Sequence, residues 1–556
     1  MRGTITIDGR HTQWRAEIGG IEVDVERKKD RISFLLPDGA GEFRGRLDHT
    51  SKAIQGQWIQ PAGAVNNTRY ATPVRFAAGS PSVWTGSVVP LDDRISFYLS
   101  IEQQPDGATT AIITNPEFNF FRRRSYLVTL NGSDVSFANP KNSQDHFSGT
   151  FDKASDRLFV PLLDGYPPLP LSRRGHDGAV GFYARTPSSA KYTYTKPMDG
   201  DGWQAASLAD VGISEKPVAT LIERILTADP TDNPVNIDSL LIARHGKLVM
   251  EEYFHGYDRE RPHDMRSASK TLATILTGIA YDHGYHLNPD TPIRSLFPAD
   301  EPFANPDARK DDVRLKALMT MTSGLACNDN NDASPGNEDN MQSQTAQPDW
   351  YKYTLDLPMV TEPGGKHAVY CSAGINLVGG AVAQATRAWL PEFFERHLAS
   401  PLQFGVYHIN LMPTGEAYMG GGLYLRPRDE LKLGQLYLSG GLWHGKRVVS
   451  EDWVRQSTTV SSTFDPQTDY DAPHEYGFGW HINQLHVGDQ TFREYSAGGN
   501  GGQIIMVIPD LDLVVAINGG SYGEFTKWYR WGLQLVPEYI IPALLQNAQT
   551  PSSPLM

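Results

Sequence analysis

The sequence predicts an α+β fold in its C-terminal two thirds, preceded by an all-β region. From Trp14 to about Arg174 the chain consists of short β-type runs broken by Gly, Pro, Asn and Asp, without helical periodicity. After this region helical and strand patterns alternate, and the chain closes with two apolar strands, 503–508 and 511–517, and a helix over 527–545. Helices at both ends of an antiparallel sheet are typical of α+β domains.

The length of 556 residues predicts two or three domains, because single cores stop growing well below this size. A stretch rich in Thr, Pro, Ser, Lys and Gly between Ala184 and Asp210 has the composition of a connector. We place the domain boundary near Lys196. The expected domains are residues 1–80, 81–196 and 197–556.

The N-terminal region contains an internal repeat. The segments 14–18 and 43–48 are echoed by 84–88 and 147–152, each pair starting with Trp and then Phe. The repeat predicts two related antiparallel β units, which are expected to be small barrels with the Trp and Phe side chains in their cores. No residues of a catalytic type recur here at useful spacing, so the expected role is to pack beside a catalytic site and narrow it.

The second half contains three elements with clear sequence signals. Residues 217–226 read as a helix, and the runs 239–244 and 247–254 read as a hairpin with His245-Gly246 at its turn. Pro427 can occupy the first turn of a helix that runs to about Leu438. A long polar loop over 328–349 is too long for a simple connection, so it is either a pocket wall or a disordered insertion.

Charge and hydropathy exclude several function classes. The net charge is −14 and there is no long basic run, which argues against nucleic acid or an anionic membrane as partner. No apolar run approaches the roughly 18 residues that a membrane span needs, and no signal-peptide core follows Met1. The chain is therefore expected to be cytoplasmic, or exported after removal of a signal. No His/Cys/Asp/Glu cluster has metal spacing, and no cofactor is expected.

Ser267 and Lys270 are the first candidate catalytic residues. They stand three residues apart at the start of an apolar helix, whose stripe is formed by Leu272, Ile275 and Ile279. On a helix this spacing brings the ammonium within reach of the hydroxyl, which places a nucleophile beside its base. The pattern alone is weak, since a capping Ser with a solvated Lys gives it too. The same spacing recurs at Ser188, where no helix is expected to start.

Two further segments supply what a serine nucleophile needs. A Ser hydroxyl is unreactive at neutral pH without a base and without donors for the oxyanion. Tyr370-Cys371-Ser372 carries a phenol and a hydroxyl, and 495–502 is a Gly-rich strand edge with bare backbone N–H groups. Taken singly, Tyr370 would more often be a core residue and Gly498-Gly499 a turn.

Together these segments resemble the Ser-x-x-Lys, Tyr-x-Asn and Lys/His-x-Gly motifs of the penicillin-recognising serine hydrolases. The resemblance covers about residues 200–545 and implies a β-lactamase-like catalytic domain. It is nearest to the class C-like branch, which holds family VIII carboxylesterases, D-amino-acid peptidases and 6-aminohexanoate-dimer hydrolases. His263 and Asp264 are interpreted as a loop and helix-capping pair, because residues so near in sequence rarely converge on one hydroxyl.

The resemblance assigns roles to individual positions. It implies that Ser267 is acylated, that Lys270 takes or shares its proton, and that Tyr370 relays this proton to the leaving group. The amides of Ser267 and Gly499 would form the oxyanion hole, and four residues would contact substrate: Ser372, Tyr495, Ser496 and Asn500. A Lys and phenol pair titrates as a unit, so neither is singled out as the base.

Two departures from the family pattern bear on the substrate. Ser372 stands where the family usually has Asn, and Ser496 where it usually has Lys or His. Without a cation at position 496, a carboxylate on the substrate would lack its partner. The sequence therefore predicts a small-molecule ester as substrate, then an amide, with weak or no β-lactam hydrolysis. The alternatives are a D-amino-acid peptidase, a β-lactamase, an oligoamide hydrolase or a non-catalytic penicillin-binding relative.

Cys327 and Cys371 are the only cysteines, and composition allows two free thiols as readily as one disulfide. The resemblance places both near the site, because Cys371 follows Tyr370 and Cys327 follows a segment that lies near the site in the resembling fold. It thereby implies a disulfide, and with it an exported protein, periplasmic or secreted.

Overall fold

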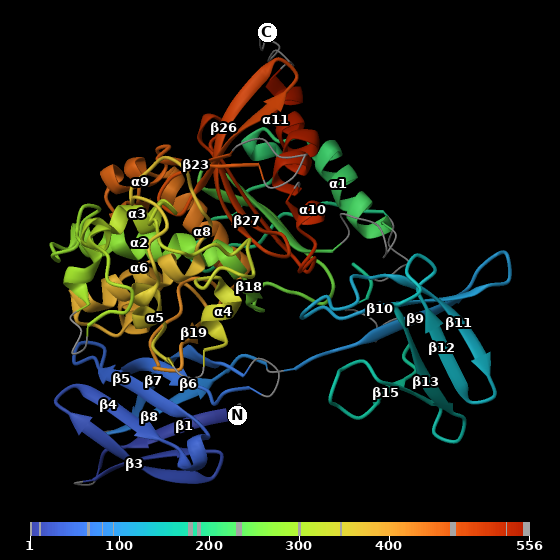
Figure 1. Cartoon of the computed structure of the whole chain (residues 1–556), viewed down its shortest axis with the longest axis horizontal. Helices are drawn as coiled ribbons and strands as arrows, with labels where there is room; N and C mark the ends of the chain where they lie inside the picture. Colours follow the sequence, from blue (N-terminus) through green and yellow to red (C-terminus); the bar gives the residue numbers. More distant parts are fainter. Residues whose placement is uncertain are drawn as a thin grey trace.

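The structure is a computed structural model of the whole chain (Figure 1). It describes residues 3–10, 13–63, 67–80, 82–92, 94–175, 182–185, 191–228, 236–297, 302–344, 347–466, 474–529 and 531–548. Two β units and an α+β domain follow one another along the chain, which confirms the expected fold class. No helix in these described ranges combines the length and apolarity that crossing a membrane requires.

The first β unit is a closed barrel of eight antiparallel strands. Each strand pairs with the next along the chain, and β8 closes the barrel by pairing with both β1 and β7. Apolar side chains fill the interior, and the rings of Trp14 and Trp84 stack at 5.0 Å between centroids. The strands are β1 (Gly3–Asp8), β2 (Trp14–Ile18), β3 (Ile21–Lys28), β4 (Arg31–Leu35), β5 (Glu42–Leu47), β6 (Ile54–Ile59), β7 (Arg69–Ser80) and β8 (Val83–Val88).

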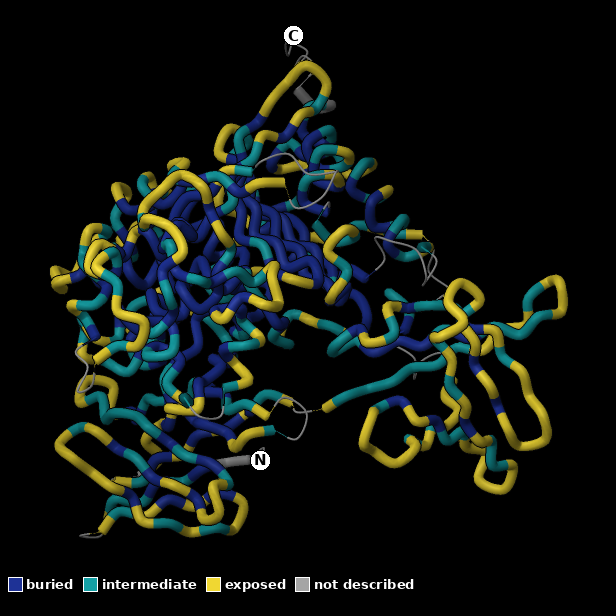
Figure 2. Tube along the Cα trace, viewed as in Figure 1, coloured by how far each residue is buried: buried dark blue, intermediate teal, exposed yellow. Residues whose placement is uncertain are grey.

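The second β unit is a curled sheet of seven antiparallel strands that pair in chain order. In Figure 2 its surface is largely exposed, whereas the α+β domain is dark with buried residues. Its small core gathers around Phe137, Tyr126 and Val160. The strands are β9 (Tyr98–Gln103), β10 (Thr109–Thr114), β11 (Ser125–Asn131), β12 (Asp134–Ala138), β13 (His146–Asp152), β14 (Arg157–Val160) and β15 (Leu169–Ser172).

The two units share local structure at β5 and β13. A Cβ on either Gly45 or Gly149 would lie 2.5 Å from a backbone oxygen of the neighbouring strand, so both positions require glycine. The turns that follow are alike, because Asp48 and Asp152 each accept a hydrogen bond from a serine hydroxyl three residues later, at 2.6 Å. The expected correspondence between the segments 43–48 and 147–152 is confirmed.

The expected correspondence between the Trp14 and Trp84 segments is wrong, and so is the boundary after residue 80. Trp84 lies on β8, which closes the first barrel, so it belongs to the same unit as Trp14. The boundary near Lys196 is also displaced, because Tyr192 and Tyr194 already pack on the α+β domain, with the Tyr194 hydroxyl donating to the Val249 carbonyl at 2.8 Å. The composition of this stretch predicted a connector, whereas in the structure tertiary contacts hold Tyr192 and Tyr194 against the α+β domain.

The α+β domain is a three-layer structure around an eight-stranded antiparallel sheet in the order β17-β16-β28-β27-β26-β25-β24-β23. Helices α1 and α11 cover one face, and α2, α6 and α8 lie in the core of the other. The strands are β16 (Ile237–Arg244), β17 (Lys247–Tyr253), β23 (Ser462–Phe464), β24 (His474–Tyr476), β25 (His481–Val487), β26 (Gln490–Gly499), β27 (Gln503–Ile508) and β28 (Leu513–Gly519).

The helices of this domain include those expected over 217–226, after Ser267 and from Pro427 to Leu438. Their bounds are α1 (Glu215–Thr227), α2 (Lys270–Asp282), α3 (Leu315–Met319), α4 (Glu338–Gln342), α5 (Trp350–Asp356), α6 (Ser372–Thr386), α7 (Leu390–Phe394), α8 (Pro427–Leu438), α9 (Glu451–Ser457), α10 (Phe525–Trp528) and α11 (Ile541–Ala548). The hairpin turn is left-handed at His245 and Gly246, as a two-residue connection requires. The expected helix over 527–545 is interrupted by a π-helical stretch, Trp531–Ile540, that contains Pro537.

The barrel and the α+β domain share one continuous sheet. Strand β7 pairs with β19 (His408–Leu411), which pairs with β20 (Leu423–Leu425), and β20 pairs with β18 (His263–Asp264). Two short strands, β21 (Leu442–Trp443) and β22 (Lys446–Arg447), form a separate hairpin. Because β18 ends three residues before Ser267, the barrel sheet is hydrogen-bonded to the strand that leads into the candidate nucleophile.

The second β unit contacts the α+β domain through the loop before β11. The Asn119 amide donates to the Tyr522 carbonyl at 3.0 Å and to Glu524 at 3.1 Å. Arg123 from the same loop is buried, and burial lowers its pKa to about 10 although the carboxylates of Asp238 and Glu524 oppose the shift. Both β units thus pack against the α+β domain; a narrowing effect on substrate access stays a prediction.

Cys327 and Cys371 form a disulfide, which confirms the pairing that the resemblance implied. Both residues are buried, and the bond joins positions 44 residues apart. The closed loop includes the polar segment 328–349, whose described part is ordered by its own hydrogen bonds and by α4. The described part of this segment is therefore folded, with Ser334, Asn337 and Met341 buried.

Replacing both cysteines by alanine should destabilise the α+β domain. Without the bond the unfolded chain regains the loop entropy of 44 residues, which the chain-entropy model sets at about 4 kcal/mol. We expect a lower urea midpoint for the Cys327→Ala/Cys371→Ala protein than for the oxidised wild type. Wild type in reductant is the matched control and should move the same way. Equal midpoints for all three samples would contradict a stabilising bond.

Candidate active site

The candidate nucleophile lies on a tight turn between a strand and a buried helix. Strand β18 leads into a single 3-10 turn, Arg266–Ser269, which continues directly as α2. Arg266 adopts a left-handed conformation with φ 46°, and its backbone N–H donates to the Asp264 carboxylate at 2.9 Å. Ser267 lies in this turn, just before α2 begins, and is partly exposed. Helix α2 itself is buried from Lys270 to Ala280.

Lys270 is placed as a general-base or proton-sharing residue would be. Its ammonium donates to Ser267 Oγ at 2.8 Å and to the Gly420 carbonyl, and it lies 4.9 Å from the centre of the Tyr370 ring. The side chain is 2% exposed. Burial alone would lower the pKa of Lys270, but Tyr370 and the carboxylates of Glu338 and Asp329 outweigh it and raise the pKa. Lys270 is therefore an ammonium ion at neutral pH.

Tyr370 is fixed by the disulfide and by the polar loop. Its carbonyl accepts a hydrogen bond from the Asp329 amide at 2.9 Å, and its ring packs 6.0 Å from that of Phe464. The next residue, Cys371, is the N-cap of α6, and its sulfur accepts from the Gly374 amide at 3.1 Å. The disulfide thus holds the turn that presents the phenol to Lys270.

Ser372 has two buried carboxyl partners that the sequence did not indicate. Its backbone N–H and its hydroxyl both donate to the same Asp329 oxygen, each at 2.7 Å, and its hydroxyl also lies 3.2 Å from Glu338 Oε2. The other Glu338 oxygen accepts from the Tyr418 hydroxyl. Ser372 is fully buried, and the expected substrate contact stays a prediction. Ser372 links the start of α6 to two buried carboxyl groups.

Asp329 and Glu338 are the residues that sequence reasoning missed. The Ser372 hydroxyl lies between an oxygen of each carboxyl group, at 2.7 Å from Asp329 and 3.2 Å from Glu338, which brings the two acids close together. Burial, followed by the charge of Glu338, raises the pKa of Asp329 to about 6. The available signal was the polar loop itself, whose length indicated a function but not which acid points inward.

Gly499 brings the edge of the sheet against the nucleophile turn. It ends β26, and a Cβ at this position would lie 2.3 Å from the Met265 carbonyl oxygen and 3.0 Å from the Ala268 nitrogen. No residue with a side chain allows this approach. The backbone of Gly499 therefore lies beside the turn that carries Ser267, as an oxyanion hole formed by the two amides requires.

Ser496 lies on the same strand in neutral surroundings. It is 8% exposed, its hydroxyl is 3.4 Å from the Glu494 carboxyl, and its partner across the sheet is His481. Burial raises the pKa of Glu494 to about 7 and lowers that of His481 to about 3, so His481 is uncharged at neutral pH. Neither Ser496 nor His481 supplies the cation that this position usually carries in the resembling family.

Tyr495 and Asn500 each contact other parts of the protein. Tyr495 is 4% exposed and its ring packs edge-on against Trp480 at 5.3 Å, so its side chain is part of the core and the expected substrate contact stays a prediction. Side chains alternate between faces along a strand, which puts Tyr495 in the core when Ser496 faces the other way. Asn500 is exposed, and its side-chain oxygen accepts from the Gly523 amide at 2.9 Å.

His263 and Asp264 have partners of their own. His263 is fully buried, and its Nε2 lies 3.0 Å from Asp238, which also contacts His255 at 2.9 Å. Asp264 accepts the Arg266 amide and pairs with the Arg266 guanidinium at 2.8 Å. Both residues brace the turn before Ser267, in agreement with their interpretation as a loop and capping pair.

Comparison with known proteins places this geometry in a family. The family model described as Beta-lactamase matches residues 223–524. The chain belongs to the beta-lactamase family. As a member of this family it is a hydrolase of the β-lactamase-fold serine hydrolase superfamily, and a small-molecule substrate follows from that class.

The relatives of this beta-lactamase family chain are distant. A 6-aminohexanoate-dimer hydrolase from Paenarthrobacter ureafaciens is 23% identical over 311 residues, which are 53% of this chain and 76% of the relative. Among solved structures, a putative 6-aminohexanoate-dimer hydrolase from Bacillus anthracis is 19% identical, with TM-score 0.43, and covers 57% of this chain and 81% of its own. EstCE1, a hydrolase with promiscuous acyltransferase activity, is 17% identical with TM-score 0.47, and covers 60% and 100%.

Within this beta-lactamase family site, Asp329→Asn should move the acid limb of the pH–activity profile. Above its pKa of about 6 Asp329 is negatively charged, and this charge raises the pKa of Lys270. Without the charge the Lys270 proton is easier to lose, so the acid limb should shift to lower pH, by roughly one unit. The measurement is kcat/KM for a neutral substrate from about pH 4 to about pH 9.

The matched control is Asp332→Asn, which removes an exposed carboxylate from the same loop. Its profile should coincide with that of wild type. If both variants shift equally, the effect is one of general charge and the assignment to Asp329 is wrong.

Proposed function

We propose that this chain is a serine hydrolase that cleaves carboxylic esters through an acyl-enzyme on Ser267. The observation that carries the proposal is the 2.8 Å hydrogen bond between Lys270 Nζ and Ser267 Oγ beside the Tyr370 ring. A partly exposed hydroxyl next to a buried ammonium and a phenol is the arrangement that activates a serine. The same geometry counts against a non-catalytic relative, for which no such alignment is needed.

In the first half-reaction, Ser267 Oγ attacks the ester carbonyl carbon and its proton passes to the Tyr370 and Lys270 pair. The carbonyl oxygen becomes an oxyanion, which the amides of Ser267 and Gly499 stabilise by hydrogen bonds. When the tetrahedral intermediate collapses, the bond to the alcohol oxygen breaks and this oxygen takes the proton from the pair. The alcohol leaves, and the acyl group remains on Ser267.

In the second half-reaction, water attacks the acyl carbonyl and gives its proton to the same pair. The intermediate collapses to the carboxylic acid, and Ser267 Oγ regains the proton. To accept the serine proton, the Tyr370 and Lys270 pair must hold one proton fewer than in its fully protonated form. The two groups are treated as one titrating unit.

The neutral surroundings of Ser496 support an uncharged substrate. A cation would hold a carboxylate with a hydrogen bond about twice as strong as a neutral one. Ser496 offers only a hydroxyl, and burial keeps His481 uncharged with a pKa of about 3. Esters also demand less of the leaving-group acid than amides, because an alkoxide departs more readily than an amide anion. An ester without a carboxylate at this end fits best.

Amide hydrolysis is the second candidate. It is favoured by the 23% identical relative, whose name is 6-aminohexanoate-dimer hydrolase. The same residues would act, with Tyr370 and Lys270 protonating the departing nitrogen. We further propose that the chain works in an oxidising compartment, periplasmic or extracellular, since the buried Cys327–Cys371 disulfide is of a kind that persists there.

Ser267→Ala should abolish turnover of a chromogenic short-chain ester. Removal of a nucleophile costs on the order of 10³-fold or more in kcat, because the remaining groups cannot form the acyl-enzyme. Ser188→Ala, in the other Ser-x-x-Lys of the sequence, is the control and should leave turnover unchanged. Mass spectrometry after a fluorophosphonate should map a single adduct to Ser267. Turnover that persists in the Ser267 variant would end the proposal.

Simple esters should be better substrates than nitrocefin. The comparison is made with one enzyme preparation, as kcat/KM for a series of neutral esters and for nitrocefin. The physical reason is that the nitrocefin carboxylate finds no cation at position 496, which forfeits a charge-assisted hydrogen bond of roughly 1.5–3 kcal/mol. Efficient nitrocefin turnover above that of the best ester would show that this interpretation of Ser496 is wrong.

A further inference from the structure

A row of buried polar side chains crosses the eight-stranded sheet and ends at Gly499. Its members are Ser239 of β16, Asn518 of β28 and Gln503 of β27, and we call them the polar row. Ser239 is the cross-strand partner of Asn518, and Gln503 is the partner of Gly499. All three side chains are fully buried, and the next residue inward on each strand is apolar. Polar groups in such surroundings destabilise a core unless each of them is hydrogen-bonded.

Hydrogen bonds within the polar row fix the orientation of the Gln503 amide. The Ser239 hydroxyl donates to the Asn518 side-chain oxygen at 2.6 Å. The Asn518 amide in turn donates to Gln503 Oε1 at 3.3 Å and to both oxygens of Glu430 on α8, at 3.0 and 2.8 Å. Gln503 Oε1 also accepts from the Gly519 N–H at 3.3 Å, and Gln503 Nε2 donates to the Gly519 carbonyl at 2.6 Å. The side chain is therefore held from two neighbouring strands' worth of partners and cannot turn without breaking several bonds.

The Gln503 amide reaches the turn 499–502, which joins β26 to β27. Its Nε2 donates to the Asn500 carbonyl at 3.2 Å. Gly501 and Gly502 of this turn have positive φ angles of 95° and 103°. Glycines in this region of φ give a turn high conformational freedom, so it keeps one geometry only if outside contacts fix it. The bond from Gln503 is one such contact, and it comes from inside the core.

Gln503 also packs directly against the turn. A Cβ on Gly499 would lie 3.1 Å from the Gln503 Cβ, and a Cβ on Gly501 would lie 2.9 Å from Gln503 Nε2. On its other side Gly499 approaches the nucleophile turn, because the same Cβ would lie 2.3 Å from the Met265 carbonyl oxygen and 3.0 Å from the Ala268 nitrogen. Gly499 is therefore packed between the nucleophile turn and Gln503, and a shift of the Gln503 side chain would change its place relative to that turn.

We propose that Gln503 is a positioning residue for the oxyanion hole, with its amide held in place by Ser239 and Asn518. The inference rests on the proposed function, because it assigns Gln503 to hydrolysis at Ser267. An oxyanion donor contributes only when it is aimed at the charge that develops in the transition state. Gln503 therefore acts on the stabilisation of the oxyanion and leaves the binding of the uncharged carbonyl unchanged. A side chain that served stability alone would not separate these two effects.

The test is Gln503→Met, which nearly conserves the side-chain volume and removes the amide. Its kcat/KM for the chromogenic ester should fall about 10–100-fold, because the donor is displaced and not deleted. Affinity for a trifluoromethyl ketone, which forms an oxyanion on the serine, should fall by the same factor. Affinity for the matching methyl ketone, which stays an uncharged carbonyl, should remain within about twofold. The limbs of the pH–activity profile should not move, because the Lys270 and Tyr370 pair keeps its contacts.

Two further variants serve as controls. Gln57→Met removes an equally buried amide, 1% exposed, which donates to the Tyr407 hydroxyl at 2.9 Å in the N-terminal barrel. It should lower stability and leave kcat/KM and both ketone affinities unchanged. Ser239→Ala removes one hydrogen bond at the far end of the polar row and should lower kcat/KM about two- to fivefold, again with loss for the trifluoromethyl ketone only. It decides the question if Gln503→Met does not fold.

Wild-type kcat/KM in Gln503→Met, or equal losses for the two ketones, overturns the proposal. So does wild-type kcat/KM in Ser239→Ala when Gln503→Met yields no folded protein. These results leave the proposed function intact as long as wild type is acylated at Ser267. If Ser267→Ala instead hydrolyses the ester as fast as wild type, the proposed function fails and the role of Gln503 fails with it.

Discussion

The structure depends on keeping one ammonium ion charged inside a protein core. Lys270 is 2% exposed, and transfer of such an ion out of water costs several kcal/mol unless charges and hydrogen bonds replace the solvent. The Gly420 carbonyl and Ser267 Oγ accept its hydrogen bonds, while Asp329 and Glu338 supply negative charge nearby. These partners come from three separate segments, because Asp329 and Glu338 both lie in the loop 328–349, so the site exists only when the chain has folded around it. The disulfide joins this loop to the start of α6, because Cys327 lies two residues before Asp329 and Cys371 one residue before Ser372. The buried charge of Lys270 would destabilise the core without these partners. With them, Lys270 holds the segments of the site together.

The turn that carries Ser267 is held from two sides by β-structure. On one side β18 is part of the sheet that runs through β20 and β19 into the N-terminal barrel. On the other side Gly499 at the end of β26 packs on the Met265 carbonyl. The left-handed backbone of Arg266 is maintained between them, with its amide bound to Asp264 and its guanidinium over the Tyr522 ring at 4.7 Å. Strained residues persist only where surrounding contacts determine them, and here both sheets do so. The barrel is therefore part of the support of the catalytic turn.

The sequence predicted most of what depends on local pattern. The α+β class, α1, α8, the hairpin with its left-handed turn and the proximity of Ser267 and Lys270 all follow from periodicity, turn chemistry or helical spacing. The sequence did not predict properties that arise only in three dimensions. Tyr495 lies in the core because of the face of the strand on which its side chain lies. The acids that Ser372 contacts come from a loop without periodicity. The barrel boundary was misplaced because the pairing of β8 with β1 joins residues about 80 positions apart, which no local signal reveals.

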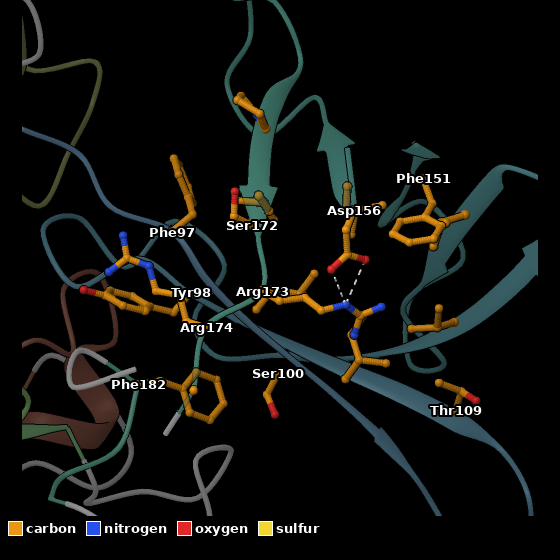
Figure 3. Close-up of a pocket in the computed structure, with 18 of the residues that line it drawn as sticks. Phe97, Tyr98, Ser100, Thr109, Phe151, Asp156, Ser172, Arg173, Arg174 and Phe182 are labelled. Atoms are coloured by element: carbon orange, nitrogen blue, oxygen red, sulfur yellow. Dashed lines mark hydrogen bonds and ion pairs between the residues drawn. The ribbon is translucent and has the colours of Figure 1, made fainter. Parts of the chain in front are cut away.

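The two β units show how one repeat can be used in two ways. In the first unit the eighth strand closes the sheet, its interior is filled by Trp14, Trp58 and Trp84, and its β7 edge extends into the sheet of the catalytic domain. In the second unit the described residues surround a cavity of about 890 Å³ (Figure 3). This unit contacts the catalytic domain through the loop before β11, where the Asn119 amide donates to the Tyr522 carbonyl and to Glu524. One copy of the repeat is thus joined to the catalytic domain by backbone pairing, and the other by side-chain contacts.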